Sequence, residues 1–198
     1  MSVFDSPEGK LEKYTKEIKE LNKPAQQQKL VDFCNRMLEK HYNDVLILNG
    51  MYSILESEKL YALAEIFVNR TIQIDPTNYH GYVLKALSLF GQTKYEECFA
   101  NYDIAISMAP DDTTLWFDKA VTLQEIDLHE DAIDLLKRIL KKHPTQVKTI
   151  NALVYSLLAE KKFEEVRKYN EKALKINPSD PEALAQKQEL QKVFGQNF

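Results

Sequence analysis

Histidine, cysteine and carboxylate side chains are the groups through which this 198-residue chain could do chemistry, and their spacing argues against catalysis. None of the four histidines stands beside another metal ligand at the spacing of a metal site; they are His41, His80, His129 and His143. The sequence has no glycine-rich phosphate loop and no common hydrolase, zinc-protease or C-x-x-C motif. Acidic neighbours such as Glu96-Glu97 do not face each other on a helix. We therefore expect no enzyme, no cofactor and no metal.

The cysteines and the overall composition indicate an ordinary packed protein. Cys34 and Cys98 occupy apolar positions of helical runs, which predicts small buried side chains rather than a disulfide. The chain is 44% hydrophobic with a net charge of −4, and no apolar run is long enough to span a bilayer. Its first residues lack the charged and apolar regions of a secretory signal. These features favour a cytoplasmic location without direct membrane insertion.

Four prolines recur every 34 residues, and a similar pattern precedes each of them. They are Pro76, Pro110, Pro144 and Pro178. The first half of each unit carries apolar residues three and four apart, such as Trp116, Ala120 and Leu123. A polar break and a second periodic run follow, as in Ala132 and Leu136. This spacing predicts two amphipathic helices per unit, with the proline one or two residues beyond the second helix. The predicted fold class is all-α.

This pattern resembles the tetratricopeptide repeat (TPR), whose period is 34 residues and whose motif is W-x2-L-G-x2-Y, A-x3-F and then P. The best unit matches it with Trp116, Ala120, Leu123, Ala132, Leu136 and Pro144. The next has Tyr82, Ala86, Leu89, Tyr95, Cys98, Tyr102 and Pro110. Tyr52, Val154 and Ile139 replace smaller family residues. The resemblance implies a right-handed superhelical solenoid of antiparallel helix pairs.

The repeat phase predicts one continuous domain of successive units. Repeats are expected at 45–78, 79–112, 113–146 and 147–180. Residues 1–44 hold two further helices, where a degenerate repeat would fall, the first beginning at Ser6-Pro7. Residues 181–198 form a C-terminal capping helix that begins after Asp180.

In the family that the chain resembles, the first helix of each repeat lines a concave groove. Carried over by phase, the groove positions of this sequence are His80, Val83, Leu84, Leu87, Phe90, Phe117, Asp118, Val121, Asn151 and Tyr155. The middle of this set is apolar, which favours an amphipathic helix or an apolar peptide as ligand. Two alternatives stay open. An adjacent helix could cover these residues, or the terminal helix of the chain could fold into the groove.

The best-known TPR ligand, the acidic C-terminal tail of heat-shock chaperones, does not fit this sequence. The clamp positions are Asn49, Ser53, Leu84, Thr114 and Asp118 in one frame, and Val83, Leu87, Asp118, Lys148 and Ala152 in the next. Neither set supplies the cationic fork that paired carboxylates need, and Asp118 would repel them.

Charge is distributed unevenly along the chain. Residues 96–134 contain eleven acidic residues and one basic residue, a balance of −10, whereas residues 137–175 contain eleven basic and four acidic residues, a balance of +7. This split would allow steering of a partner or self-association, although alternating helix faces are the more common cause. Lys137, Arg138, Lys141 and Lys142 cluster near one helix end without interleaved aromatic residues, so we expect no nucleic-acid partner.

The sequence thus predicts a non-enzymatic adaptor or scaffold. It would hold a helix or extended segment of another protein in its groove, within a larger assembly. The alternative is a chaperone-like assembly factor that shields an apolar client segment. Recovery in one stable complex would favour the scaffold, and weak contact with many clients would favour the chaperone.

Overall fold

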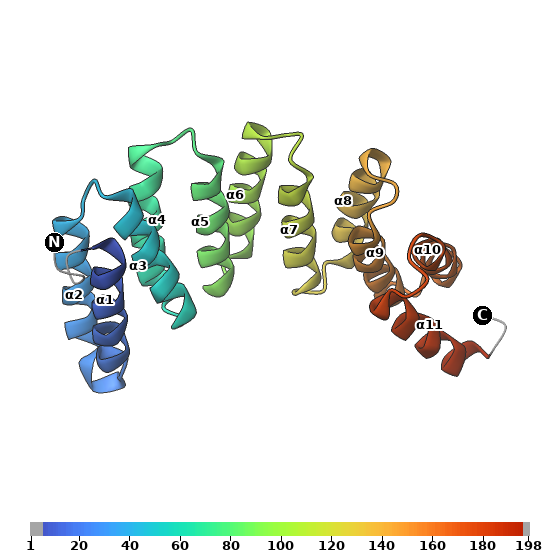
Figure 1. The fold of residues 1–198 in the computed structure, drawn as a ribbon, viewed down its shortest axis with the longest axis horizontal. Coiled ribbons are helices and arrows are strands. Elements are labelled where there is room, and N and C mark those ends of the chain that lie inside the picture. The colour runs from blue at the N-terminus through green and yellow to red at the C-terminus, as the bar shows by residue number, and fades with distance from the viewer. Residues whose placement is uncertain (1–5, 196–198) are drawn as a thin grey trace. The chain divides into compact units, whose positions relative to one another are not determined.

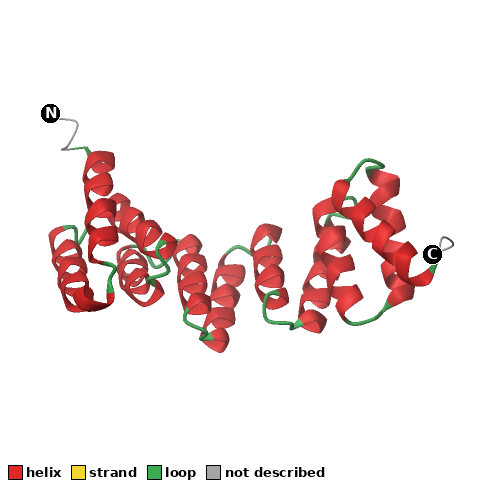
Figure 2. Cartoon of the chain, turned by 90° about the horizontal axis from the view of Figure 1, so that it is seen from below, coloured by secondary structure: helices red, strands yellow, loops and turns green. Residues whose placement is uncertain are grey.

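The computed structural model describes residues 6–195, without the side chains of Val193 and Phe194. All regular elements in this part of the chain are helical (Figures 1 and 2). The α-helices are α1 (Pro7–Leu21), α2 (Gln27–Lys40), α3 (Val45–Ser57), α4 (Tyr61–Ile74), α5 (Tyr79–Gly91), α6 (Tyr95–Met108), α7 (Thr113–Gln124), α8 (His129–Lys142), α9 (Val147–Ala159), α10 (Phe163–Ile176) and α11 (Pro181–Phe194). A short 3-10 helix, Pro24–Gln26, precedes α2. The prediction of an all-α fold built from helix pairs is confirmed.

The chain separates into two compact units, unit 1 (residues 1–110) and unit 2 (residues 111–198). The boundary falls between α6 and α7, two residues before the end of the second expected repeat. In unit 1, α3 pairs with α4 and α5 with α6; in unit 2, α7 pairs with α8 and α9 with α10. We call α3, α5, α7 and α9 the first helices and their partners the second helices. The first helices begin 34 residues apart, as the prolines do.

The turn inside each repeat has the same backbone geometry. One non-glycine residue per turn adopts a left-handed conformation with φ between 55° and 60°; these are Lys59, Thr93, Asp127 and Lys161. The next residue then donates its N–H to a carbonyl five positions back, as Lys94 does to Leu89 at 2.9 Å. This is the Schellman arrangement, which satisfies the last carbonyls of the first helix. The second helix then begins at once; α6, for example, has no side-chain cap at its N-terminus.

The turn between repeats depends on a proline and a polar cap. Pro76 lies two residues beyond the end of α4, where its ring cannot continue the helix. Asn78 then accepts a hydrogen bond from the N–H of His80 (3.1 Å) at the start of α5. Asp112 caps α7 in the same way through the N–H of Thr114 (3.0 Å). These caps satisfy helix N–H groups that would otherwise lack a partner.

The N-terminal helices share a hydrophobic core with the first full repeat. Ile18 of α1 and Phe33 of α2 are buried together with Leu48 of α3 and Phe67 of α4. Cys34 belongs to the same cluster and is a free thiol, and burial raises its pKa to about 12. Cys98 is also free and buried. The expectation that both cysteines are packing residues is therefore confirmed.

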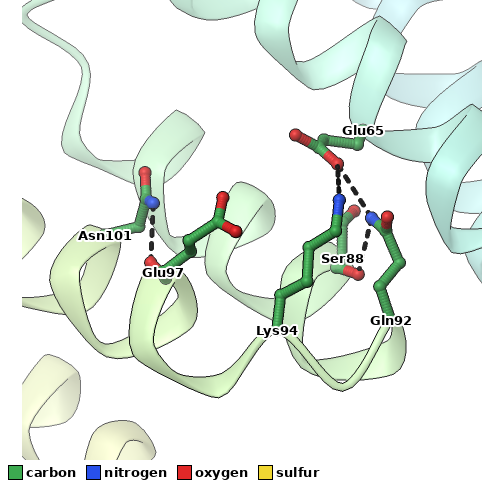
Figure 3. A network of polar contacts seen from close by, with 6 residues as sticks. All are labelled: Glu65, Ser88, Gln92, Lys94, Glu97 and Asn101. Atoms are coloured by element: carbon green, nitrogen blue, oxygen red, sulfur yellow. Dashed lines mark hydrogen bonds and ion pairs between the residues drawn. The ribbon is translucent and has the colours of Figure 1, made fainter.

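A polar network joins the two repeats of unit 1 on the outside of this core (Figure 3). The carboxylate of Glu65 on α4 accepts a hydrogen bond from Nε2 of Gln92 (2.8 Å) and lies 3.8 Å from Nζ of Lys94. Gln92 also donates to the carbonyl of Ser88 (3.2 Å). These contacts fix the turn between α5 and α6 against α4.

The last helix packs on the second helix of the final repeat in unit 2, as Figure 1 shows. Nδ2 of Asn170 on α10 donates to the carbonyl of Ala183 (2.8 Å), and Ala183 is fully buried. Asp180 caps α11 through the N–H of Ala183 (2.9 Å). Helix α11 thus closes the α10 face of the repeat, which was the role expected of a capping helix.

Candidate partner-binding face

Unit 1 places its predicted groove positions on α5, where they differ in exposure. Val83 and Phe90 are partly buried against the cluster formed by α5 and α6, and Leu84 packs against the core of α1–α4. Leu87 is 39% exposed, and His80 is exposed as well. Ordinary core packing therefore covers much of the surface of Val83, Leu84 and Phe90. Leu87 and His80 are left open to a ligand.

A hollow of about 130 Å³ lies beside these residues in unit 1. Its walls are Val45, Asn49, Thr71, Asp75, Asn78, His80, Gly81 and Leu84. Val45 and Leu84 supply apolar surface, and Asn49, Asp75 and His80 supply polar groups. The ring of His80 lies against that of Tyr79, with centroids 4.2 Å apart. Sequence reasoning missed Val45 and Asp75, because they come from the start of α3 and the end of α4 and carry no motif.

Tyr52 holds α5 in position beside this hollow. It replaces a small family residue, yet it is 96% buried, and its hydroxyl donates to the carbonyl of Leu84 (3.1 Å). Burial raises the pKa of Tyr52 to about 12, because the ionised phenolate would lose its hydration. The larger side chain therefore links α3 to α5 instead of disrupting the repeat.

Unit 2 places two opposite charges, Asp118 and Lys148, beside Phe117 on its first helices. Phe117, Asp118 and Val121 of α7 are all partly buried. Lys148 of α9 lies over the Phe117 ring, with Nζ 4.4 Å from the centroid. Burial raises the pKa of the Asp118 carboxyl, and the charge of Lys148 only partly opposes this effect. This face can therefore offer a ligand both apolar contact and charge.

Tyr155 of α9 is the most exposed aromatic residue among the predicted groove positions, at 54%. The edge of its ring meets that of His129, with centroids 5.7 Å apart. His129 itself is buried at the start of α8. This contact gives His129 a packing role, and Tyr155 presents its free surface to solvent.

Asn151 has a different environment from the other predicted groove positions. It is 2% exposed, and its side-chain amide donates to Asp180 (2.7 Å) and Glu182 (3.3 Å) at the start of α11. Nε2 of Gln186 donates back to the Asn151 carbonyl (3.3 Å). The terminal helix therefore covers this position, as one of the alternatives from the sequence allowed. Asn151 has no surface free for a ligand in this arrangement.

Three ion pairs neutralise part of the charge in unit 2. Lys137 pairs with Glu165 (2.5 Å), Lys162 with Glu130 (2.6 Å), and Lys142 with Asp111 (2.8 Å). These pairs link neighbouring helices, so the acidic and basic stretches of the sequence partly neutralise one another within the unit. Exposed pairs of this kind contribute little to stability individually.

Residues 6–195 contain no group of three or more histidine, cysteine or acidic side chains placed to hold a metal ion. None of the helices in this range has both the length and the apolar composition needed to cross a membrane.

Comparison with known proteins identifies the fold. No protein-family model and no curated protein sequence matches the chain. Among solved structures, residues 41-end of MamA from Desulfovibrio magneticus RS-1 align with a TM-score of 0.64 at 10% identity, covering 78% of this chain and 88% of that one. Another MamA crystal structure gives 0.60 at 13% identity, covering 91% and 94%. YrrB, described as a TPR protein with an unusual peptide-binding site, gives 0.62 at 14% identity, covering 88% and 90%. The fold is that of a TPR protein.

Proposed function

We propose that this chain is a protein–protein interaction module that holds a helix or an extended segment of another protein against its first helices. The observation that carries the proposal is the exposure of Leu87 on α5 and of Tyr155 on α9. Both lie at positions that line the ligand groove in TPR proteins. Leu87 is 39% exposed and Tyr155 54% exposed, so each leaves a large share of an apolar side chain in contact with water.

The chemistry of the two faces supports a largely apolar ligand. In unit 1, Leu87 and the apolar walls of the 130 Å³ hollow, Val45 and Leu84, offer surface that a partner side chain would remove from water. Burial of such surface contributes roughly 25 cal/mol per Å². The peptide-binding site named for YrrB, which has a similar fold, agrees with a peptide segment as ligand. We further propose that the chain acts as a scaffold or adaptor within a larger assembly.

Substitution of the two exposed residues tests this function. The full chain is used to capture its partners, which are identified by mass spectrometry and then bound in purified form. Leu87→Glu and Tyr155→Glu should each weaken binding at least tenfold, because each would place a carboxylate in an apolar contact. Both side chains are partly exposed, so the folded state should tolerate the changes.

Matched controls come from the second helices. Ile104 on α6 is 41% exposed and Ile176 on α10 is 39% exposed, close to the value for Leu87. Ile104→Glu and Ile176→Glu should leave binding unchanged. The proposal is wrong if the first-helix variants retain every partner, or if the control variants lose them to the same extent.

A further inference from the structure

Asp118 differs from the other charged residues of unit 2 in its surroundings. Its side chain is partly buried on α7, next to Phe117 and three residues from Val121. The backbone carbonyl of Asp118 accepts a hydrogen bond from Thr122 (2.9 Å). Its carboxylate, in contrast, forms no hydrogen bond or ion pair with any residue in the described part of unit 2. A charge that has lost part of its hydration and has no partner is costly to the free protein.

Lys148 does not serve as an ion-pair partner for the Asp118 carboxylate. Its charge acts on Asp118 from α9, but its ammonium group lies over the Phe117 ring, 4.4 Å from the centroid, and is not within ion-pair distance of the carboxylate. Asp112, at the start of α7, adds a second negative charge to the surroundings. Two carboxylates therefore stand against one ammonium group here, and the charge of Lys148 offsets only part of the cost of burying Asp118.

We propose that unit 2 binds a partner segment that carries lysine or arginine beside an apolar residue, with the cation paired to Asp118 and the apolar side chain placed on Val121 and Tyr155. This inference rests on the proposed function and specifies its ligand. The proposed site prefers a cation, whereas the carboxylate clamp of other TPR proteins binds anions, which Asp118 would repel. Arginine would fit best, because its planar fork can donate two hydrogen bonds to one carboxylate.

The opposite assignment, an acidic segment bound by Lys148, is weaker on the same observations. Lys148 is exposed and hydrated, so an ion pair there would gain little. Its ammonium group is also already engaged with the Phe117 ring. Asp118 is the more buried of the two charges and therefore gains more from a partner of opposite sign.

A displayed library of random 16-residue peptides, selected on the full chain, tests the proposal. Selected peptides should carry lysine or arginine next to an aromatic or aliphatic residue. A selected synthetic peptide should bind the Asp118→Asn variant about tenfold more weakly, which is the effect of losing one charge-assisted hydrogen bond. Selection on Asp118→Lys should instead enrich aspartate or glutamate at the same peptide position.

Two further variants separate binding from structural effects. Asp131, an exposed carboxylate on α8, serves as the matched control, and Asp131→Asn should bind the peptide as the unmodified chain does. Lys148→Met should bind it at least as tightly, because a competing cation is removed. If Lys148→Met instead weakens binding of the basic peptide tenfold, the assignment of the cation to Asp118 is wrong. This test holds even if the Asp118 variants fold poorly.

The outcomes also distinguish this inference from the proposed function. Selection of apolar peptides without basic residues, or equal binding by Asp118→Asn, would overturn the inference and leave the interaction module intact. If selection on the full chain enriches no peptide beyond what the Leu87→Glu/Tyr155→Glu double variant enriches, both the proposed function and this inference fail. A change in self-association of the Asp118→Asn chain by analytical ultracentrifugation, without a peptide preference, would assign the face to a second copy and overturn the inference.

Discussion

Residues that share one repeat phase can still have different environments. Asn151 and Tyr155 lie one helical turn apart on α9, and both were predicted to face the groove. The start of α11 buries Asn151, whereas Tyr155 is 54% exposed. Phase fixes the direction in which a side chain leaves its helix, but it does not determine which element lies in front of it.

At the residue scale, the buried side chain of His41 in unit 1 predicts that the stability of the fold depends on pH. His41 is 8% exposed, and its Nε2 lies 2.9 Å from the hydroxyl of Tyr14. Burial lowers the pKa of His41 below its ordinary value of 6.5, an effect that Lys40 reinforces and Asp44 opposes. Below pH 6.5 the unfolded chain therefore takes up this proton before the folded chain does, and stability falls as the pH falls.

Substitution of His41 should reduce this acid sensitivity. We expect the His41→Gln variant to lose less free energy of unfolding between pH 7 and pH 5 than the unmodified chain, because glutamine does not titrate. Urea unfolding at the two pH values measures the difference. His143→Gln, which changes an exposed histidine, is the control. An undiminished pH dependence in His41→Gln would contradict the account.

At the scale of elements, the turns inside the repeats are held by backbone geometry. Each places a non-glycine residue in the left-handed region, where a Cβ atom is crowded. Thr93, with φ of 60°, is the most strained by type, because its side chain is β-branched. Asp127 has the same φ, but aspartate tolerates this region better.

Glycine at position 93 should stabilise unit 1. We expect Thr93→Gly to raise the free energy of unfolding by about 1 kcal/mol, the cost of the left-handed conformation less the added entropy of an unfolded glycine. Chemical denaturation gives this value directly. Asp127→Gly should give a smaller gain. A Thr93→Gly variant less stable than the unmodified chain would mean that the Thr93 side chain contributes a contact absent from this description.

The sequence predicts the elements better than the site. The 34-residue period predicts where α5, α7 and α9 begin, because a proline and an apolar stripe are local signals, and the polar caps Asn78 and Asp112 add to them at α5 and α7. The left-handed turn residues carry no such signal, since Lys59 and Thr93 are not typical of that conformation. The hollow in unit 1 could not be predicted either, because Asp75 and Val45 meet there only after the helices pack.

At the scale of the whole molecule, each unit presents a first-helix face with its own character. The face of unit 1 combines Leu87 with a small hollow that has polar and apolar walls. The face of unit 2 combines Tyr155 with two opposite charges that form no ion pair, Asp118 and Lys148. In unit 2 the second helices have a different character from the first-helix face, because ion pairs connect α8 with the start of α10. The central claim is that a partner binds the first helices.

Hydroxyl-radical footprinting of the full chain, alone and bound to its purified partner, tests that claim most directly, because it reports on side chains. Bound partner should reduce oxidation of Tyr155 on α9 and of Leu87 on α5 several-fold. Met108, a reactive side chain that is 38% exposed on α6, should be oxidised equally in both states. Protection of Met108 together with unchanged oxidation of Tyr155 and Leu87 would place the partner on the second helices and contradict the account.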